Sequence, residues 1–120
     1  MIRINALFVC SRNQWRSPTA EHVFSDDARF FVRSRGLSPR SPRRLSEDDL
    51  AWADVVFVME SDHRSRIKST MRDALGNTPV HVLDIPDDYH YMDPELVNLL
   101  IDGTGVHFPE ISDSDRTPLV

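Results

Sequence analysis

Residues 10–17, with the sequence Cys-Ser-Arg-Asn-Gln-Trp-Arg-Ser, limit most strongly what this chain can fold into. They follow an apolar and partly β-branched run at 2–9, which predicts a buried strand. They lead into Ser17, Pro18 and Glu21, where a capping hydroxyl, a proline and an early carboxylate predict the start of a helix. A tight loop therefore joins a strand to a helix N-terminus, with Cys10 at its start and Arg16 near its end.

The composition of this loop predicts an anion site. Backbone N–H groups in such a loop converge into a concave nest, and the helix dipole adds partial positive charge, so a phosphate dianion is a suitable guest. The planar guanidinium of Arg16 can hold two phosphate oxygens. The same positive surroundings stabilise a thiolate at Cys10, which would face the phosphorus atom. The predicted phosphate-binding residues are Ser11, Arg12, Asn13, Gln14, Trp15, Arg16 and Ser17.

Two side chains of the loop have further predicted tasks. Asn13 suits a cradling loop because asparagine tolerates the left-handed backbone conformation. Ser17 either caps the helix or donates its O–H to the thiolate, and the sequence leaves both interpretations open.

These residues resemble the low-molecular-weight protein tyrosine phosphatase family. The family motif is Cys, five residues, Arg, Ser and usually Pro, with Asn at the fourth position. The chain matches it at Cys10, Asn13, Arg16, Ser17 and Pro18. Family members usually carry Gly where Arg12 stands and commonly a second cysteine where Trp15 stands. The family's protective intramolecular disulfide is therefore not expected here.

Composition restricts the setting in which this loop works. The 120 residues suffice for one α/β domain, and a net charge of −5 argues against general nucleic-acid binding. The single cysteine excludes an internal disulfide and, with no secretory signal, predicts a cytoplasmic protein. No apolar run approaches the ~18 residues of a spanning helix, so no membrane partner is expected. The histidines lack metal-ligand spacing, so neither a metal nor a cofactor is expected.

The remaining chain alternates predicted strands and helices. Strands are predicted at 30–34, 54–59 and 80–83, and helices at 18–28, 46–52, 64–75 and 94–101, the last with Leu96, Leu99 and Leu100 facing the sheet. Ser46 and Asp49 predict a capping box. The resemblance implies a doubly wound α/β fold at 1–101, with four parallel strands in the order 2-1-3-4 and helices on both faces. Residues 102–120 are predicted to form a poorly ordered tail.

The segment 33–44 is rich in Arg, Ser and Pro. It predicts either a solvated loop or, because loops after parallel strands gather at the carboxyl edge of the sheet, a set of arginines near the phosphate nest. Glu60 and Asp62 follow a predicted central strand and either cap the next helix or orient the nest. His22 is predicted to be a surface or packing histidine rather than a substrate contact.

The segment 84–96 should leave the fourth strand at the same edge and carries the candidate general acids. The family holds Asp-Pro-Tyr-Tyr here, which makes Asp87 the first choice, Asp88 the second and Asp93 the third. The alternative is that these are turn carboxylates only. Tyr89 and Tyr91 are candidate walls for an aromatic substrate, or ordinary half-buried tyrosines.

The resemblance implies phosphomonoester hydrolysis through a cysteinyl-phosphate. In that interpretation Cys10 is the nucleophile, Arg16 stabilises the phosphoryl group during its transfer, and Asp87 protonates the leaving oxygen. The alternatives are a thiol-dependent arsenate reductase, a phosphocysteine carrier and a phosphate-binding module without turnover. The expected substrate is a phosphotyrosyl protein or a small phosphomonoester. Phosphoarginine, a nucleotide or a phosphorylated nucleic-acid terminus remain alternatives.

Overall fold

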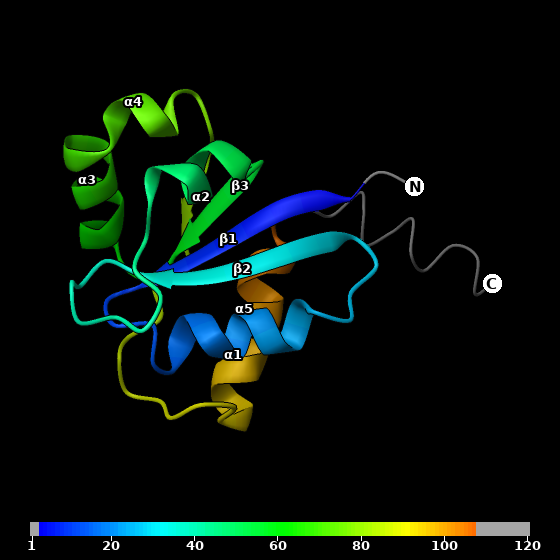
Figure 1. Cartoon of the computed structure of the whole chain (residues 1–120). Helices are drawn as coiled ribbons and strands as arrows, with labels where there is room; N and C mark the ends of the chain where they lie inside the picture. Colours follow the sequence, from blue (N-terminus) through cyan, green and yellow to red (C-terminus); the bar gives the residue numbers. More distant parts are fainter. Residues whose placement is uncertain (1–2, 108–120) are drawn as a thin grey trace.

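A four-stranded parallel sheet forms the centre of the molecule. The computed structural model describes residues 3–107. Its strands are β1 (Ile4–Cys10), β2 (Phe30–Gly36), β3 (Val55–Val58) and β4 (Val80–Val82). They lie in the order β2-β1-β3-β4 with every pair parallel (Figure 1). The predicted strand order and fold class are therefore confirmed.

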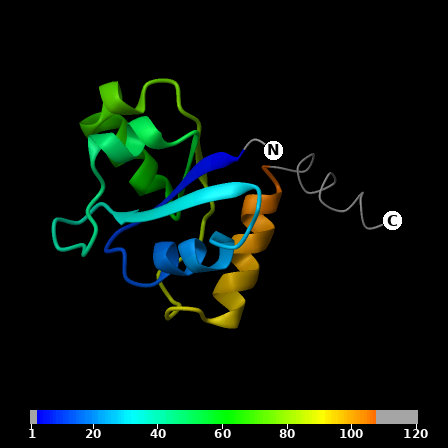
Figure 2. The ribbon, with the colours of Figure 1, turned by 45° about the vertical axis from the view of Figure 1, so that its right-hand side comes forward.

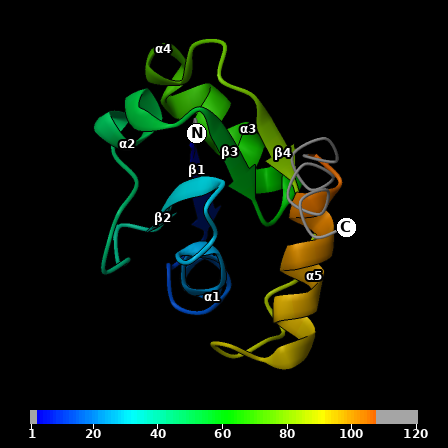
Figure 3. The ribbon, with the colours of Figure 1, turned by 90° about the vertical axis from the view of Figure 1, so that its right-hand side faces the viewer.

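Helices cover both faces of the sheet. The helices α1 (Arg16–Phe24) and α5 (Pro94–Gly105) pack on one face (Figure 2). On the other face lie α2 (Glu47–Trp52), α3 (Ser61–Thr70) and α4 (Arg72–Leu75), and Figure 3 shows the two groups on opposite sides of the strands. None of the helices within 3–107 is long and apolar enough to cross a membrane.

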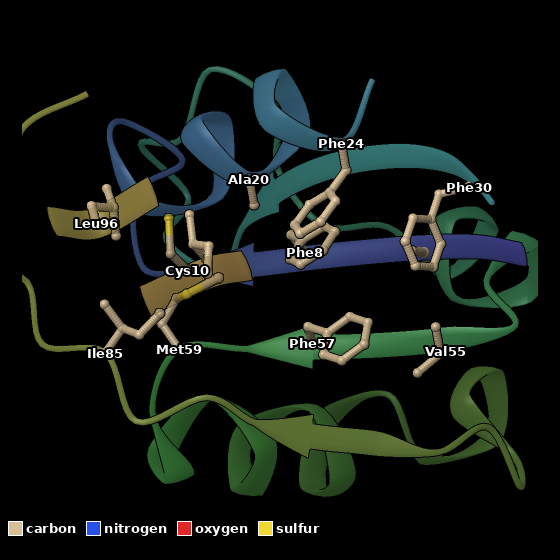
Figure 4. Packing of buried hydrophobic residues seen from close by; sticks show 12 residues of the cluster. Phe8, Cys10, Ala20, Phe24, Phe30, Val55, Phe57, Met59, Ile85 and Leu96 are labelled. Carbon is tan, nitrogen blue, oxygen red and sulfur yellow. The ribbon is translucent and has the colours of Figure 1, made fainter. Parts of the chain in front are cut away.

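The alternation of side chains along β1 decides where the cysteine points. Phe8 and Cys10 belong to the hydrophobic cluster on the α1 and α5 side, whereas Leu7 and Val9 belong to the opposite cluster. All four are buried, as expected for a strand covered on both faces. Figure 4 shows Cys10 at the end of β1 beside Met59, Ile85 and Leu96, with the stacked Phe8 and Phe24 further along the strand.

The loops that leave the strands meet at the carboxyl edge of the sheet. Ser38 N–H donates to the carbonyl oxygen of Ser11 over 2.7 Å, and Ile85 N–H donates to that of Met59 over 2.9 Å. Gly36 is required at this junction, because a Cβ there would lie 2.0 Å from Ser41 Oγ and 2.9 Å from the Arg12 carbonyl carbon. The loops after β1 and β2 are therefore pressed together.

The first helix is shifted relative to its prediction. It begins at Arg16 with Trp15 as N-cap residue, so Ser17 lies inside the helix and the predicted Ser17 cap is wrong. It ends at Phe24 rather than near residue 28. After the helix the Asp27 carboxylate accepts the Arg29 N–H over 2.9 Å, which is a local turn rather than a further helical turn.

The long helix predicted at 64–75 is two helices. Backbone dihedrals at Met71 are φ −130° and ψ 36°, which interrupt the helical path between α3 and α4. Ser69 and Thr70 both donate their hydroxyls to the Arg66 carbonyl, over 3.2 and 2.6 Å. Such side-chain bonds compete with the backbone ladder and explain the break. The capping box of Ser46 and Asp49 at the start of α2 is confirmed.

The last helix is longer than predicted, because it continues past Ile101 to Gly105. Gly103 suits this position, since a Cβ there would lie 3.3 Å from Leu83. Leu96 and Leu100 are fully buried, but Leu99 is 37% exposed, so its predicted orientation toward the sheet is wrong. Of the predicted tail, 108–120 lies outside the described residues.

The different burial of two neighbouring leucines gives a test of this packing. Leu100→Ala should lower the free energy of unfolding by about 2–5 kcal/mol, because it leaves a cavity in the core. Leu99→Ala on the same helix changes the same chemistry at an exposed site and should cost well under half as much. Urea unfolding of both variants measures the difference, and equal losses would contradict the assigned helix orientation.

Candidate active site

The only cysteine of the chain lies at the floor of the loop after β1. Cys10 is 3% exposed, and its Sγ lies 3.0 Å from Ser17 Oγ. The backbone N–H of Asn13 points at the same sulfur over 3.3 Å. A hydrogen-bond donor therefore faces the sulfur from within the loop, as a thiolate requires.

Asn13 holds the loop in its curved shape. Its φ is 55°, the left-handed conformation predicted for this residue. Its side-chain Nδ2 donates to Ser17 Oγ over 2.9 Å and to Ser34 Oγ over 3.1 Å. Its Oδ1 accepts from Arg43 Nε over 3.2 Å. Because a guanidinium can only donate, this contact fixes which end of the amide is the oxygen.

The hydrogen-bond network around Asn13 continues across β2. Ser34 Oγ accepts from Asn13 and from Arg43 Nη2, so its own O–H is left to donate to Glu21 Oε1 over 2.7 Å. The same Glu21 oxygen lies 2.8 Å from Arg43 Nη2. Ser17 Oγ likewise accepts from Asn13, which directs its proton to Cys10 Sγ or to the Arg35 carbonyl at 3.3 Å. Of the two interpretations of Ser17, the geometry favours the contact with sulfur.

Arg16 is buried with one edge of its guanidinium held and the other edge unsatisfied. The side chain is 2% exposed, and Nη1 donates to Glu60 Oε2 over 2.6 Å and to the Ile85 carbonyl over 2.8 Å. The hydrogen bond from Arg16 holds the pKa of Glu60 below its ordinary value. Nε has no hydrogen-bond partner among the described residues, and its distance to Asp87 Oδ1 is 3.6 Å. A buried donor without an acceptor marks a place for a ligand oxygen.

Of the three candidate acids, Asp87 lies next to Arg16. Its side chain is 59% exposed, at the mouth of the site. Asp88 is exposed and makes no ion pair with the described residues. Asp93 accepts the Glu95 N–H over 2.9 Å and is the N-cap of α5, which is a structural task. Of the three carboxylates, Asp87 is therefore the one that the structure describes beside Arg16.

The segment that carries Asp87 is tethered to the loop and to α1. Met92 N–H donates to Thr19 Oγ1 over 2.9 Å, and Tyr91 Oη lies 2.9 Å from His22 Nδ1. The rings of Trp15 and His90 meet edge to face, with centroids 4.9 Å apart. His22 is therefore an exposed residue that links α1 to this segment through Tyr91.

The two predicted wall tyrosines differ in their surroundings. Tyr89 is partly buried and packs against the hydrophobic cluster on the α1 and α5 side. Tyr91 is 49% exposed, with its hydroxyl held by His22. Trp15 and His90 form the aromatic contact between the cysteine loop and the acidic segment.

The arginines of the segment 33–44 fall into three groups. Arg33 and Arg35 turn to the buried Asp49, over 3.2 and 3.0 Å, and thereby fix α2 to β2. Arg43 reaches Asn13 instead. Arg40 and Arg44 are exposed. Only part of the segment therefore serves the loop, and that part acts through hydrogen bonds rather than as a diffuse positive field.

Two contacts of the site were not predicted from the sequence. His63 Nε2 lies 3.0 Å from Ser11 Oγ, and Arg43 bonds to Asn13. Both contacts join residues far apart in the chain. A histidine three positions after Glu60 was a signal only for a helix cap, and Arg43 is one arginine among several.

These groups together can bind and attack a tetrahedral oxyanion. The loop supplies the Asn13 N–H and leads into the N-terminus of α1, while Arg16 supplies a guanidinium nitrogen, Nε, that has no acceptor among the described residues. Cys10 is a candidate nucleophile, and Asp87, whose Oδ1 lies 3.6 Å from Arg16 Nε, is a candidate proton donor. Within residues 3–107 there is no group of three or more His, Cys, Asp or Glu side chains that could hold a metal ion.

Comparison with known proteins identifies the fold. No protein-family model and no curated protein matches the chain. The arginine phosphatase YwlE from Geobacillus stearothermophilus is similar, with a TM-score of 0.68 and 21% identity over 96% of each chain. A low molecular weight phosphotyrosine phosphatase from Vibrio cholerae gives a TM-score of 0.72 and 16% identity, covering 92% of this chain and 98% of that one. The tyrosine phosphatase Wzb from Escherichia coli, in complex with phosphate, gives 0.66 and 18%, covering 85% and 94%.

The chain has the fold of the low-molecular-weight protein tyrosine phosphatases. The similarity extends over nearly the whole length of these neighbours, so the chain contains nearly all of their fold. At these identities the likeness concerns the fold, and the chemistry depends on the residues that occupy the site.

The unsatisfied edge of Arg16 predicts phosphate binding. Inorganic phosphate should raise the melting temperature of the protein. At a phosphate concentration one hundred times the dissociation constant, the free energy of unfolding should rise by ~2.7 kcal/mol. Arg16→Lys should remove most of this stabilisation, because a lysine ammonium cannot bind two phosphate oxygens in the way that a planar guanidinium can. Thermal unfolding at constant ionic strength measures it, with the exposed Arg72→Lys as matched control. An equal response of both variants would contradict a phosphate site at Arg16.

Proposed function

We propose that the protein is a cysteine-dependent phosphomonoester hydrolase of the protein tyrosine phosphatase type. The observation that carries the proposal is the buried Cys10 thiol beneath a loop whose Arg16 Nε has no acceptor within residues 3–107, with Asp87 3.6 Å from that nitrogen. Nucleophile, oxyanion-binding group and proton donor are thus in one site. The fold of phosphatases that surrounds the site supports the same assignment.

In the first step the Cys10 thiolate attacks phosphorus and forms a sulfur–phosphorus bond, while the bond from phosphorus to the leaving oxygen breaks. Asp87 donates a proton to the leaving oxygen. The loop N–H groups and Arg16 stabilise the equatorial oxygens during the transfer. In the second step Asp87 takes a proton from a water, which attacks the cysteinyl-phosphate and releases inorganic phosphate and the thiolate. Neither step uses a metal or cofactor.

Ser17 and Asn13 support the leaving thiolate in the second step. Ser17 Oγ at 3.0 Å and the Asn13 N–H at 3.3 Å are the hydrogen-bond groups that face the sulfur among the described residues. They stabilise the negative charge that returns to sulfur when its bond to phosphorus breaks.

The residues at the rim of the site would contact the group that carries the phosphate. Trp15 and His90 form an aromatic side, and Gln14 and Arg12 are exposed on the loop. We propose a phosphorylated substrate, either a phosphotyrosyl protein or a small phosphomonoester. Because the structural neighbours include an arginine phosphatase and tyrosine phosphatases, we would test phosphoarginine and phosphotyrosine first, followed by nucleotides and 5′-phosphorylated oligonucleotides.

Other classes of function have less support. The chain has one cysteine, whereas a thiol-dependent arsenate reductase relays through further cysteines. A binding module without turnover does not require a carboxylate beside the anion-binding arginine, as Asp87 is here. We also propose a cytoplasmic location, because a nucleophilic thiol needs a reducing compartment to remain free.

The nucleophile is tested by removing its sulfur. Cys10→Ser should abolish turnover of p-nitrophenyl phosphate, since a neutral hydroxyl replaces the thiolate. The variant should still be stabilised by inorganic phosphate, which separates lost chemistry from a lost site. Phosphate binding by the wild type without turnover of any substrate in the panel would identify a binding module instead.

The proton donor is tested by a matched pair of neighbouring aspartates. Asp87→Asn should lower kcat by ~10²–10⁴-fold on phenyl phosphate, whose leaving oxygen needs a proton, and less on p-nitrophenyl phosphate. Asp88→Asn makes the same substitution one residue away and should change kcat little. Steady-state kinetics on both substrates decides between them, and a large loss only in Asp88→Asn would reverse the assignment.

A further inference from the structure

His63 is a buried titratable residue that contacts the phosphate loop from the opposite face of the sheet. It lies in the first turn of α3 and is 2% exposed. Its ring contacts two groups, the hydroxyl of Ser11 in the loop after β1 and the backbone of Glu60. Ser11 directly follows Cys10, and Glu60 holds Arg16. The mechanism described above gives His63 no chemical step.

The contacts of the ring determine its tautomer. Glu60 N–H donates to His63 Nδ1 over 3.2 Å, so Nδ1 is the acceptor and carries no proton. Neutral imidazole then carries its proton on Nε2, which donates to Ser11 Oγ over 3.0 Å. One neutral ring therefore satisfies one donor and one acceptor, on two segments of the site.

The charges around the ring disfavour a second proton. Burial lowers the pKa of His63, and the Arg16 guanidinium lowers it further. Arg66 acts in the same direction, whereas Glu60, whose Oε2 lies 3.8 Å from Nε2, and Asp62 oppose it. A proton on Nδ1 would also face the Glu60 N–H, donor against donor. The neutral form is thus the form that fits.

We propose that His63 is a positioning residue whose neutral, Nε2-protonated ring holds Ser11 and Glu60 in register, so that the loop and the guanidinium of Arg16 face one bound phosphate. The carbonyl of Ser11 is already fixed from the other side, by Ser38 N–H at 2.7 Å and Ser41 Oγ at 3.3 Å. His63 restrains the side chain of the same residue, through its contact with Ser11 Oγ. Its effect on turnover depends on the proposed phosphatase function, but its effect on phosphate binding does not.

The proposal predicts a specific pH response. The pKa of His63 is lowered from 6.5, so the neutral ring persists below pH 6.5 and is lost only when the pH falls through the lower value. Protonation then removes the bond from Glu60 and loosens the site. Phosphate affinity should therefore contain an acid-side component that belongs to His63 and disappears when residue 63 cannot titrate.

Two amides separate the contacts of the ring. In His63→Asn the shorter side chain can accept from Glu60 N–H but does not reach Ser11, whereas in His63→Gln the amide N–H can reach Ser11. His63→Asn should weaken phosphate binding about tenfold, as expected for one lost hydrogen bond of ~1.4 kcal/mol. His63→Gln should restore most of that affinity. Both variants should lack the His63 component of the pH profile.

Calorimetric titration with inorganic phosphate across pH measures these effects, and Ser11→Ala completes a double-mutant cycle. Ser11→Ala should weaken binding about as much as His63→Asn, with no further loss when the two are combined. In ¹⁵N spectra of the histidine rings, the proton of His63 should be on Nε2, with a pKa below 6.5.

Three results would overturn the proposal: a proton on Nδ1, wild-type phosphate affinity in His63→Asn, or additive losses with Ser11→Ala. If His63→Asn does not fold, the ring spectra of the wild type and the affinity of Ser11→Ala decide alone. Wild-type protein that binds phosphate with the expected His63 behaviour but turns over no substrate would refute the proposed phosphatase function and leave this inference standing.

Discussion

The arrangement of the site depends on the buried guanidinium of Arg16, which is held by hydrogen bonds at Nη1. Taking a guanidinium out of water costs on the order of several kcal/mol unless charge and hydrogen bonds compensate it. Here Nη1 of Arg16 is matched by Glu60 and by the Ile85 carbonyl, which lie 44 and 69 residues further along the chain. The loops after β1, β3 and β4 must therefore meet at one point. The parallel sheet ensures this, because it brings the ends of these strands to the same edge.

The structural features that could be predicted from the sequence are those that depend on a few neighbouring residues. Apolar runs at β1 and β3, the capping box of Ser46 and the left-handed Asn13 each depend on a few neighbouring residues and on general conformational preferences. The strand order and the doubly wound fold came from the resemblance carried by residues 10–21, and the observed order β2-β1-β3-β4 agrees. The convergence of the predicted loops on one edge followed from the same topology.

The features that escaped prediction depend on contacts distant in sequence or on a change at an element's end. His63 meets Ser11 across 52 residues and Arg43 meets Asn13 across 30, and no local pattern specifies either pairing. The start of α1 at Arg16 depends on the loop fold, which turned an apparent Ser17 cap into a partner of the sulfur. Leu99 satisfied the helical spacing, but the angle at which α5 packs left it 37% exposed.

The lone thiol of Cys10 has a consequence for redox chemistry. Peroxide converts a thiolate to a sulfenic acid, which is normally rescued when a nearby thiol condenses with it. Trp15 stands where that neighbour would be, and the chain has no other cysteine to offer. An oxidised Cys10 would therefore have to be recovered by a small-molecule thiol that can enter the site. The resistance of this protein to oxidative inactivation would then depend on the glutathione-type pool around it rather than on its own covalent structure.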